Sequence, residues 1–193
     1  MSPLTLLEAA GQSAAEQSNP EAALRQLLSP LQETLGERGP DIVPPDGAAQ
    51  FFVAGAFMVS PDTSWHMLVA NIGFPPEQSR LMIPLAGGHP GRVHASRAPL
   101  HLPDTEADGQ FRQYLRTARM GSAVYVPMLW ESRFLGQIVL AAKARHSLSE
   151  TDFLTMRAAA PLAAAMWIAK GGDAWLHATY PPSEGFRVPV DGM

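Results

Sequence analysis

No cysteine occurs among the 193 residues of this chain. Without thiols, the protein has no disulfide bond, thiolate metal site, cysteine nucleophile or thioether-attached chromophore. A strong charge of one sign is also missing, because 14 Lys and Arg residues stand against 18 Asp and Glu residues, for a net charge of -4. This balance offers no broad attraction to phosphate backbones or anionic lipids, so we expect neither nucleic acid nor a membrane as a partner.

Long apolar runs are absent as well. No run reaches the roughly 18 residues that cross a bilayer, and the first ten residues lack the basic stretch that opens a secretory signal. We therefore expect a cytoplasmic protein. Material for a core is ample, with 46% hydrophobic and 17% charged residues, and the length suits one folded domain with some flanking structure.

Helical signals dominate residues 1–39, which we assign to an N-terminal helical segment. Asn19, Pro20 and Glu21 combine a capping residue, a proline at the first helical position and an acid in the first turn. A shorter helix is expected from Pro3 to Ala10. The helix that begins at Pro20 carries a stripe at spacings of three and four, made of Leu24, Leu27, Leu28, Leu31 and Leu35. Residues 40–47, rich in Pro and Gly, form a connector.

Residues 40–170 have the pattern of one α+β domain. Two hairpins are predicted, the first from strands 51–59 and 65–72 and the second from strands 123–130 and 134–142. Residues 75–108 are expected to be mainly loops with one short strand at 80–84, followed by a short helix over 110–120. A final helix over 149–170 opens with a capping box in which Asp152 takes the place of Glu.

The second half of this last helix is apolar on nearly every face, which indicates burial on more than one side. One side would cover the sheet, and the other needs a partner. The leucine stripe of the N-terminal segment is the candidate partner, either from the same chain or from a second subunit. Residues 171–193 lack periodicity and are predicted to be an extended C-terminal tail.

Three ordered motifs between Gly88 and Leu154 resemble the GAF domain family. They are Gly88-His89-Pro90-Gly91-Arg92-Val93 with Pro99-Leu100-His101-Leu102-Pro103-Asp104, then Ser122-Ala123-Val124-Tyr125-Val126-Pro127-Met128 with Phe134-Leu135-Gly136-Gln137-Ile138-Val139-Leu140, and finally Leu148-Ser149-Glu150-Thr151-Asp152-Phe153-Leu154. The resemblance implies a GAF/PAS-like antiparallel β-sheet flanked by helices, here with an N-terminal helical extension. It also implies a small-molecule pocket between the sheet and residues 83–119, and dimers built from terminal helices.

Departures from known GAF classes narrow the function. The Asn-Lys, Phe and Asp-Glu signature of cyclic-nucleotide-binding members is not found in this sequence. Bilin-binding members generally attach their chromophore through cysteine, and methionine-sulfoxide-reducing members need catalytic cysteines, which this chain lacks. We therefore expect a protein that is not an enzyme, and the sequence names no cofactor.

The pocket loops contain three histidines, two arginines and two aspartates: His89, His94, His101, Arg92, Arg97, Asp104 and Asp108. The histidines do not have the spacing of a compact zinc motif. Asp104 is as well suited to bind nearby backbone amides as to bind a ligand. Aromatic residues with polar tips are typical of small-molecule sites. We predict ligand contacts for Trp65, His94, His101, Asp104, Phe111, Tyr114 and Tyr125, and no catalytic residue or metal ligand.

These observations favour a stand-alone sensor that binds a small metabolite and signals in trans, through a homodimer of its terminal helices or through a partner protein. The alternative is an accessory or assembly protein that uses the GAF fold as a platform for protein interactions, with Trp175, Tyr180 and Phe186 of the tail as docking residues. A third hypothesis is a sensor or redox protein with a histidine-bound haem or metal.

Overall fold

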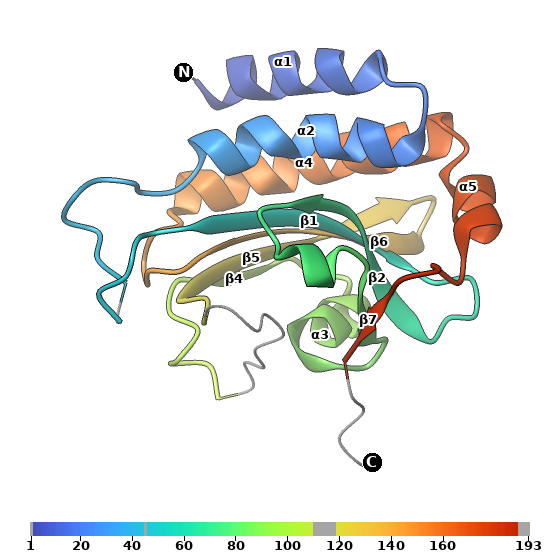
Figure 1. Ribbon diagram of the computed structural model, residues 1–193. Helices are drawn as coiled ribbons and strands as arrows, with labels where there is room; N and C mark the ends of the chain where they lie inside the picture. The colour runs from blue at the N-terminus through green and yellow to red at the C-terminus, as the bar shows by residue number, and fades with distance from the viewer. Residues whose placement is uncertain (1, 45, 110–118, 189–193) are drawn as a thin grey trace.

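A computed structural model of the chain describes residues 2–44, 46–109 and 119–188. Three long helices cover one face of a seven-stranded sheet, two of them packed against the sheet and the first stacked on these two, and a short helix with several loops covers the other face (Figure 1). We call the first face of the sheet the upper face and the second the lower face. The α+β prediction is confirmed. Among the residues described, no helix has the length and hydropathy needed to span a bilayer.

The helical layer consists of α1 (Pro3–Ala15), α2 (Pro20–Thr34) and α4 (Glu150–Ala169). The Asn19 side chain accepts a hydrogen bond from the amide of Ala22, as its capping position predicts. Helix α1 runs past its predicted end at Ala10, because Ala14 is fully buried and extends the packed face by one turn.

The predicted capping box starts α4. The hydroxyl of Ser149 accepts from the amide of Asp152 at 3.2 Å, and the Asp152 carboxylate accepts from the amide of Ser149 at 2.8 Å. The leucine stripe of α2 packs against both α4 and the upper face, so the partner that α4 needs on this side comes from the same chain. Four leucines of the stripe are fully buried: Leu24, Leu27, Leu28 and Leu31.

The sheet has the strand order β4-β5-β6-β1-β2-β3-β7. Its strands are β1 (Phe52–Val59), β2 (Trp65–Ile72), β3 (Leu81–Pro84), β4 (Leu100–Leu102), β5 (Ser122–Trp130), β6 (Arg133–Ala142) and β7 (Phe186–Arg187). Both predicted hairpins are confirmed, because β1 pairs with β2 and β5 with β6 in antiparallel fashion. The sheet is mixed, since β7 runs parallel to β3.

Two α-helices and one short 3-10 helix form where the sequence predicted none. Helix α3 (Gly88–Ser96) occupies part of the stretch expected to be loops, and the short 3-10 helix Pro76–Gln78 precedes β3. Helix α5 (Gly172–Thr179) occupies the start of the segment expected to be extended. Both α3 and α5 are short and begin with glycine, so tertiary packing stabilises them against low intrinsic propensity. The predicted helix over 110–120 falls mainly on residues 110–118, outside the described residues.

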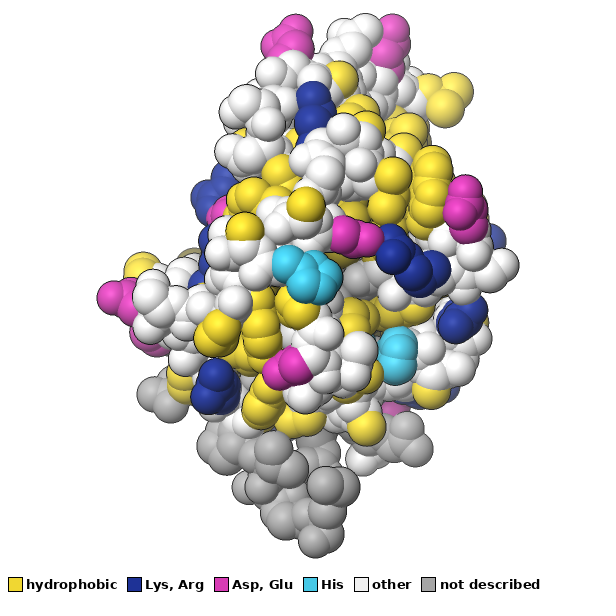
Figure 2. All heavy atoms as spheres, turned by 90° about the vertical axis from the view of Figure 1, so that its right-hand side faces the viewer, with side chains coloured by type: hydrophobic (Ala, Val, Ile, Leu, Met, Phe, Trp, Pro, Cys, Tyr) yellow, Lys and Arg dark blue, Asp and Glu magenta, His cyan; other side chains and the backbone are white. Residues whose placement is uncertain are grey.

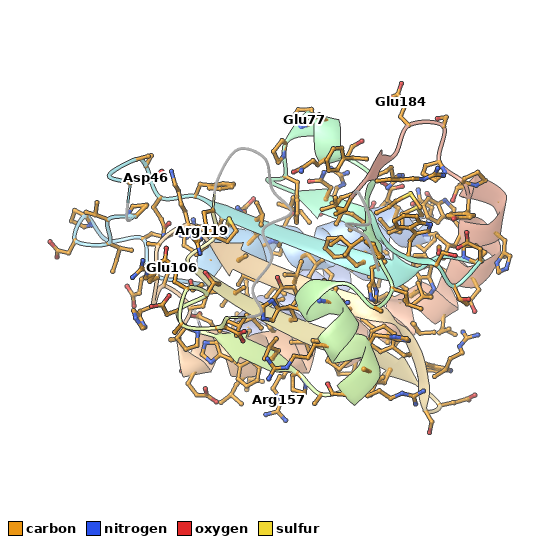
Figure 3. The ribbon with its side chains drawn as sticks, turned by 90° about the horizontal axis from the view of Figure 1, so that it is seen from below. Asp46, Glu77, Glu106, Arg119, Arg157 and Glu184 are labelled. Carbon is orange, nitrogen blue, oxygen red and sulfur yellow. The ribbon has the colours of Figure 1, made fainter. Side chains whose placement is uncertain are left out.

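The core has one large and two small parts. The large cluster fills the space between the helical layer and the upper face. The two smaller clusters lie on the lower face, where alternate residues of the same strands point. The lower face is therefore apolar too, and it is the face toward which α3 packs (Figure 3).

Candidate functional site

The lower face supplies an apolar floor. Its buried members come from the six strands β1 to β6 and from the residue range that precedes β5: Val53, Phe57, Leu68, Leu81, Ile83, Leu102, Met120, Ala123, Val139 and Ala141. The half-buried rings of Phe74 and Tyr125 pack against both small clusters and join them. This floor can take the apolar part of a small molecule.

Polar groups gather at one end of the floor, around Asp108. The Nη1 atom of Arg92 donates to the Asp108 carboxylate at 3.3 Å, and the Nε2 atom of His89 lies 3.3 Å from the same oxygen. The two basic residues stand three positions apart on α3, which places them on one side of that helix. The buried ring of His89 stacks on Tyr125 with 5.9 Å between ring centroids. Helix α3 thus carries the two side chains that face the Asp108 carboxylate.

An open hollow of about 610 Å³ lies beside Arg92 and Asp108. The described residues that line it are Arg92, Leu102, Pro103, Asp104, Ala107, Asp108 and Gly109. One wall therefore comes from α3, and the opposite wall comes from the loop that follows β4. Charged side chains with solvent access stand next to an apolar floor, which is the combination typical of small-molecule sites.

Ion pairs fix the loop wall to the end of the β5–β6 hairpin. Arg145 pairs with Glu106, and its Nε atom lies 3.6 Å from Asp104. Arg119 lies 3.6 Å from Glu106. Glu106 and Arg119 lie at the same end of the molecule as Asp46, whose carboxylate pairs with Lys143 at 2.8 Å (Figure 3). The loop that carries Asp108 is therefore held in place by charge pairs.

Two buried polar residues attach the start of α3 to the sheet. His66 on β2 makes a hydrogen bond of 3.0 Å from its Nε2 atom to the carbonyl of Leu85. The Gln137 amide on β6 donates to the carbonyl of Pro90 at 3.2 Å and lies 3.4 Å from Nδ1 of His66. The pKa of His66 is lowered to about 4, mainly by burial, which outweighs the opposing effect of the Leu85 hydrogen bond and is aided by the nearby His94.

Sequence reasoning did not identify His66 or Gln137, and it noted His89 and Asp108 only as pocket-loop residues. Both His66 and Gln137 interrupt otherwise apolar strand runs, and both are fully buried. A polar residue at a core position of a strand is the signal that would have found them.

Among the predicted site residues, Tyr125 lies on the lower face beside His89. Asp104 lines the hollow and also accepts a hydrogen bond of 2.9 Å from the amide of Glu106, so it holds the loop. Trp65 packs instead against the large core cluster that lies under the helices. Phe111 and Tyr114 lie outside the described residues.

The two predicted histidines make structural contacts. His94 packs edge-on against the rings of Phe134 and His66, with centroid distances of 4.9 Å and 5.8 Å. His101 makes a hydrogen bond of 2.9 Å from Nε2 to the carbonyl of Leu148, and its ring stacks on Phe153 at 5.0 Å. His101 therefore ties β4 to the start of α4. In the described ranges, no three His, Cys, Asp or Glu side chains are grouped as a metal would require.

Comparisons with known proteins point to one family. A family model described as "GAF domain" matches residues 19–166, a range that includes α2, strands β1 to β6 and most of α4. No curated protein sequence matches the chain.

Similar solved structures cover nearly the whole fold. The GAF domain of a phosphoenolpyruvate-protein phosphotransferase from Acinetobacter has a TM-score of 0.72 at 15% identity, covering 89% of this chain and 97% of that chain. The corresponding domain from Coxiella burnetii gives 0.70 at 21%, covering 88% and 96%. A free methionine-R-sulfoxide reductase from Neisseria meningitidis, solved with its substrate, gives 0.69 at 18%, covering 89% and 91%. At such identities the likeness shows the fold.

Proposed function

Because this chain belongs to the GAF domain family, we propose that it is a regulatory module that binds a small molecule over the lower face of its sheet. The observation that carries this proposal is the position of Asp108, held by Arg92 and His89 at the edge of the hollow and next to the apolar floor. The Neisseria reductase was solved in complex with its substrate, so a protein of the same fold holds a small molecule. That precedent supports the proposal.

The chemistry of the site indicates the kind of ligand. We propose that an ionised or strongly polar group of the ligand contacts Arg92 and Asp108, because charge-assisted hydrogen bonds are stronger than neutral ones. The side chain of Arg92 is half exposed and retains donors that Asp108 does not use. The apolar part of the ligand would lie toward Tyr125 and the floor.

We also propose that the module binds its ligand without converting it. The chain has no cysteine, so the thiol chemistry that a sulfoxide reductase of this family needs is unavailable to it. The Asp108 carboxylate is held by an ion pair with Arg92 and lies close to the ring of His89, an arrangement suited to positioning a charged group of a ligand. The proposed role is therefore regulation by occupancy.

Such a module would signal by changing its association with a second copy of the chain or with a partner protein. We propose a homodimer formed through α1 and α4, since each helix has an exposed leucine: Leu4 is 79% exposed and Leu154 is 49% exposed. Ala158 and Pro161 follow Leu154 at spacings of four and three, and both are exposed on α4. Exposed apolar stripes of this kind are typical of association surfaces. A partner protein on the same surface is the accessory-protein alternative.

Native mass spectrometry of gently purified protein, followed by thermal shift measurements with a metabolite panel, tests the ligand proposal. The expected result is a bound small molecule that raises the melting temperature. Arg92→Ala should reduce its affinity about tenfold or more, because one charged hydrogen-bond donor is lost. Arg97→Ala is the matched control, since Arg97 follows the same helix but donates to the carbonyl of Ser132.

The outcomes separate the alternatives. Binding that survives in Arg97→Ala and is lost in Arg92→Ala supports the site. A ligand that binds both variants equally well contradicts the site. A protein that purifies with no small molecule, responds to none of the panel and carries a bound polypeptide instead favours the accessory-protein alternative.

A further inference from the structure

The C-terminal segment passes around the edge of the sheet from the helical layer to the lower face. After α4 the chain turns at Gly171, whose φ is 67°, and enters α5. It then descends from α5 to β7, which pairs with β3 on the opposite side of the molecule from α1 (Figure 1). One short segment therefore connects the two layers of the fold.

Helix α5 is firmly attached to the helical layer. The indole nitrogen of Trp167 donates to Asp173 at 3.1 Å, and the Trp167 and Trp175 rings pack edge to face at 6.1 Å. Asp173 also pairs with Arg133 of the β5–β6 hairpin at 2.5 Å. Leu176 is buried in the large core cluster. These contacts anchor one end of the segment.

The residues after α5 are held more lightly. Residues 183–185 and Arg187 are exposed, and β7 is two residues long. Its backbone bonds to β3 run from the amide of Phe186 to the carbonyl of Arg80 at 3.2 Å and from the amide of Val188 to the carbonyl of Met82 at 2.9 Å. Segments with short pairing and exposed backbone open at lower free energy than the core does.

A side-chain hydrogen bond closes the segment at its upper end. The hydroxyl of Tyr180 donates to the carboxylate of Asp62 at 2.6 Å, in the turn between β1 and β2. Burial alone would raise the pKa of Asp62, but hydrogen bonds from Ser60, Tyr180 and the amide of Ser64 lower it. Asp62 therefore stays ionised and keeps its role as acceptor at neutral pH.

The segment covers a surface that is otherwise apolar. The β3 residues Leu81, Met82 and Ile83 are buried, and the half-buried Phe186 and Val188 pack against the lower-face cluster that contains Leu81 and Ile83. On the face that carries α5 and β7, hydrophobic side chains form patches between separate charged residues (Figure 2). Releasing the segment would expose the β3 edge and one side of the apolar floor.

We propose that residues 180–188 form a strap that opens from β3 as a unit while α5 stays docked, with the Tyr180–Asp62 hydrogen bond as its latch. An open strap frees the carbonyls of Arg80 and Met82, and an unpaired strand edge can accept another extended segment. The strap thereby controls access to the edge of the sheet. This device operates whether or not a ligand occupies the proposed site at Asp108.

Paired spin labels on the full chain test the strap. The protein lacks cysteine, so Glu77→Cys and Glu184→Cys accept labels at these two positions alone. Both glutamates are exposed and lie at the same edge of the molecule seen from below (Figure 3). The expected result is a main short distance with a minor longer one. Removing the latch by Tyr180→Phe should raise the longer population about fivefold, the effect of one lost hydrogen bond.

A second label pair, Glu77→Cys with Ala174→Cys, reports on α5. Its distance should stay unchanged in Tyr180→Phe. Gly185→Ala is a second variant that leaves the Tyr180–Asp62 hydrogen bond intact. Its new Cβ would stand 3.3 Å from the sulfur of Met82, so this variant should also favour the open strap. The proposal is overturned if the distance between the labels at positions 77 and 184 has a single value that is the same in the wild type, Tyr180→Phe and Gly185→Ala. Parallel movement of both label pairs overturns it too, because α5 would then leave with the strap.

Discussion

His66 on β2 is fully buried, and this burial lowers the stability of the folded protein at acidic pH. Its pKa falls from 6.5 to about 4, mainly because burial removes water from the imidazolium form. The unfolded chain therefore binds a proton that the native protein does not bind between these two values. Stability is fully present above about pH 6.5 and declines as pH falls toward about 4, by up to roughly 3 kcal/mol.

Urea denaturation at several pH values between 7 and 4 measures this effect. His66→Phe should remove most of the decline, because phenylalanine cannot be protonated, although it should lower stability at neutral pH by leaving the Leu85 carbonyl without its donor. An identical pH dependence in the wild type and His66→Phe would show that other groups cause the decline.

Gly91 shows how closely α3 approaches the loop before it. A Cβ atom at this position would stand 2.4 Å from the carbonyl carbon of Ala86, which is backbone and cannot move aside cheaply. Gly91→Ala should therefore lower the free energy of unfolding by about 1–3 kcal/mol. Gly11→Ala in α1 is the matched control, since a Cβ there meets nothing within 4 Å, and it should be neutral or stabilising by up to about 1 kcal/mol.

Thermal melting of the two glycine variants distinguishes them. The helix propensity of alanine favours both substitutions equally, so any difference comes from the space around each Cβ. Equal melting temperatures would mean that α3 can shift away from Ala86, and that the close approach does not determine its position.

At the scale of elements, local signals predicted the parts of the fold that they can determine. Helices α2 and α4 have caps and apolar periodicity within their own sequence, and both hairpins have strand runs joined by short polar turns. Helix α3 contains Gly88, Pro90 and Gly91, which disfavour helix, and it forms because the sheet below packs against it. Strand β7 depends on pairing with distant β3, which no local pattern reveals.

The candidate site was predicted in part for the same reason. The sequence predicted a pocket between the sheet and residues 83–119, and the structure places Tyr125 beside His89 and Asp104 at the hollow. The sequence could not show that His89 lies at the site whereas His101 contacts the start of α4, because both histidines have similar loop-like surroundings in the sequence. Only the register of β4 against β5 sends His101 toward α4.

His101 should therefore act on stability and not on ligand binding. His101→Ala removes the bond to the Leu148 carbonyl and the stack on Phe153, which should lower the free energy of unfolding by about 1–3 kcal/mol. Chemical denaturation measures this loss, and His177→Ala on the exposed side of α5 serves as the control. Loss of ligand affinity at unchanged stability would return His101 to the list of ligand contacts.

At the scale of the whole molecule, the two faces of the sheet support different roles. The upper face is closed by α2 and α4 of the same chain, so a dimer formed through the helices would use the outer side of the helical layer. The lower face keeps charged groups next to an apolar floor. The strap connects these layers at the β3 edge. Binding on one face can influence assembly on the other only if the two assembled states differ in ligand affinity.

Dimerisation through the outer side of the helical layer gives the last prediction. Helices α1 and α4 contact each other, and Lys170, which follows the last residue of α4, donates to the carbonyl of Ala15 at 2.7 Å, so the two helices form one surface. Leu154→Glu would bury an unpaired charge in the proposed interface. The dimer should therefore weaken about 100-fold or more, which sedimentation equilibrium can measure.

The control for this variant is Val43→Glu, which changes another exposed apolar residue, 62% accessible and outside the helical layer. Its dimer should be as strong as that of the wild type. A wild-type protein that remains monomeric at all concentrations would contradict the homodimer, whereas a dimer that tolerates Leu154→Glu would place the interface on another face. Because Leu154 is half exposed in the single chain, its replacement costs the folded monomer little, and the oligomeric state reports on the interface alone.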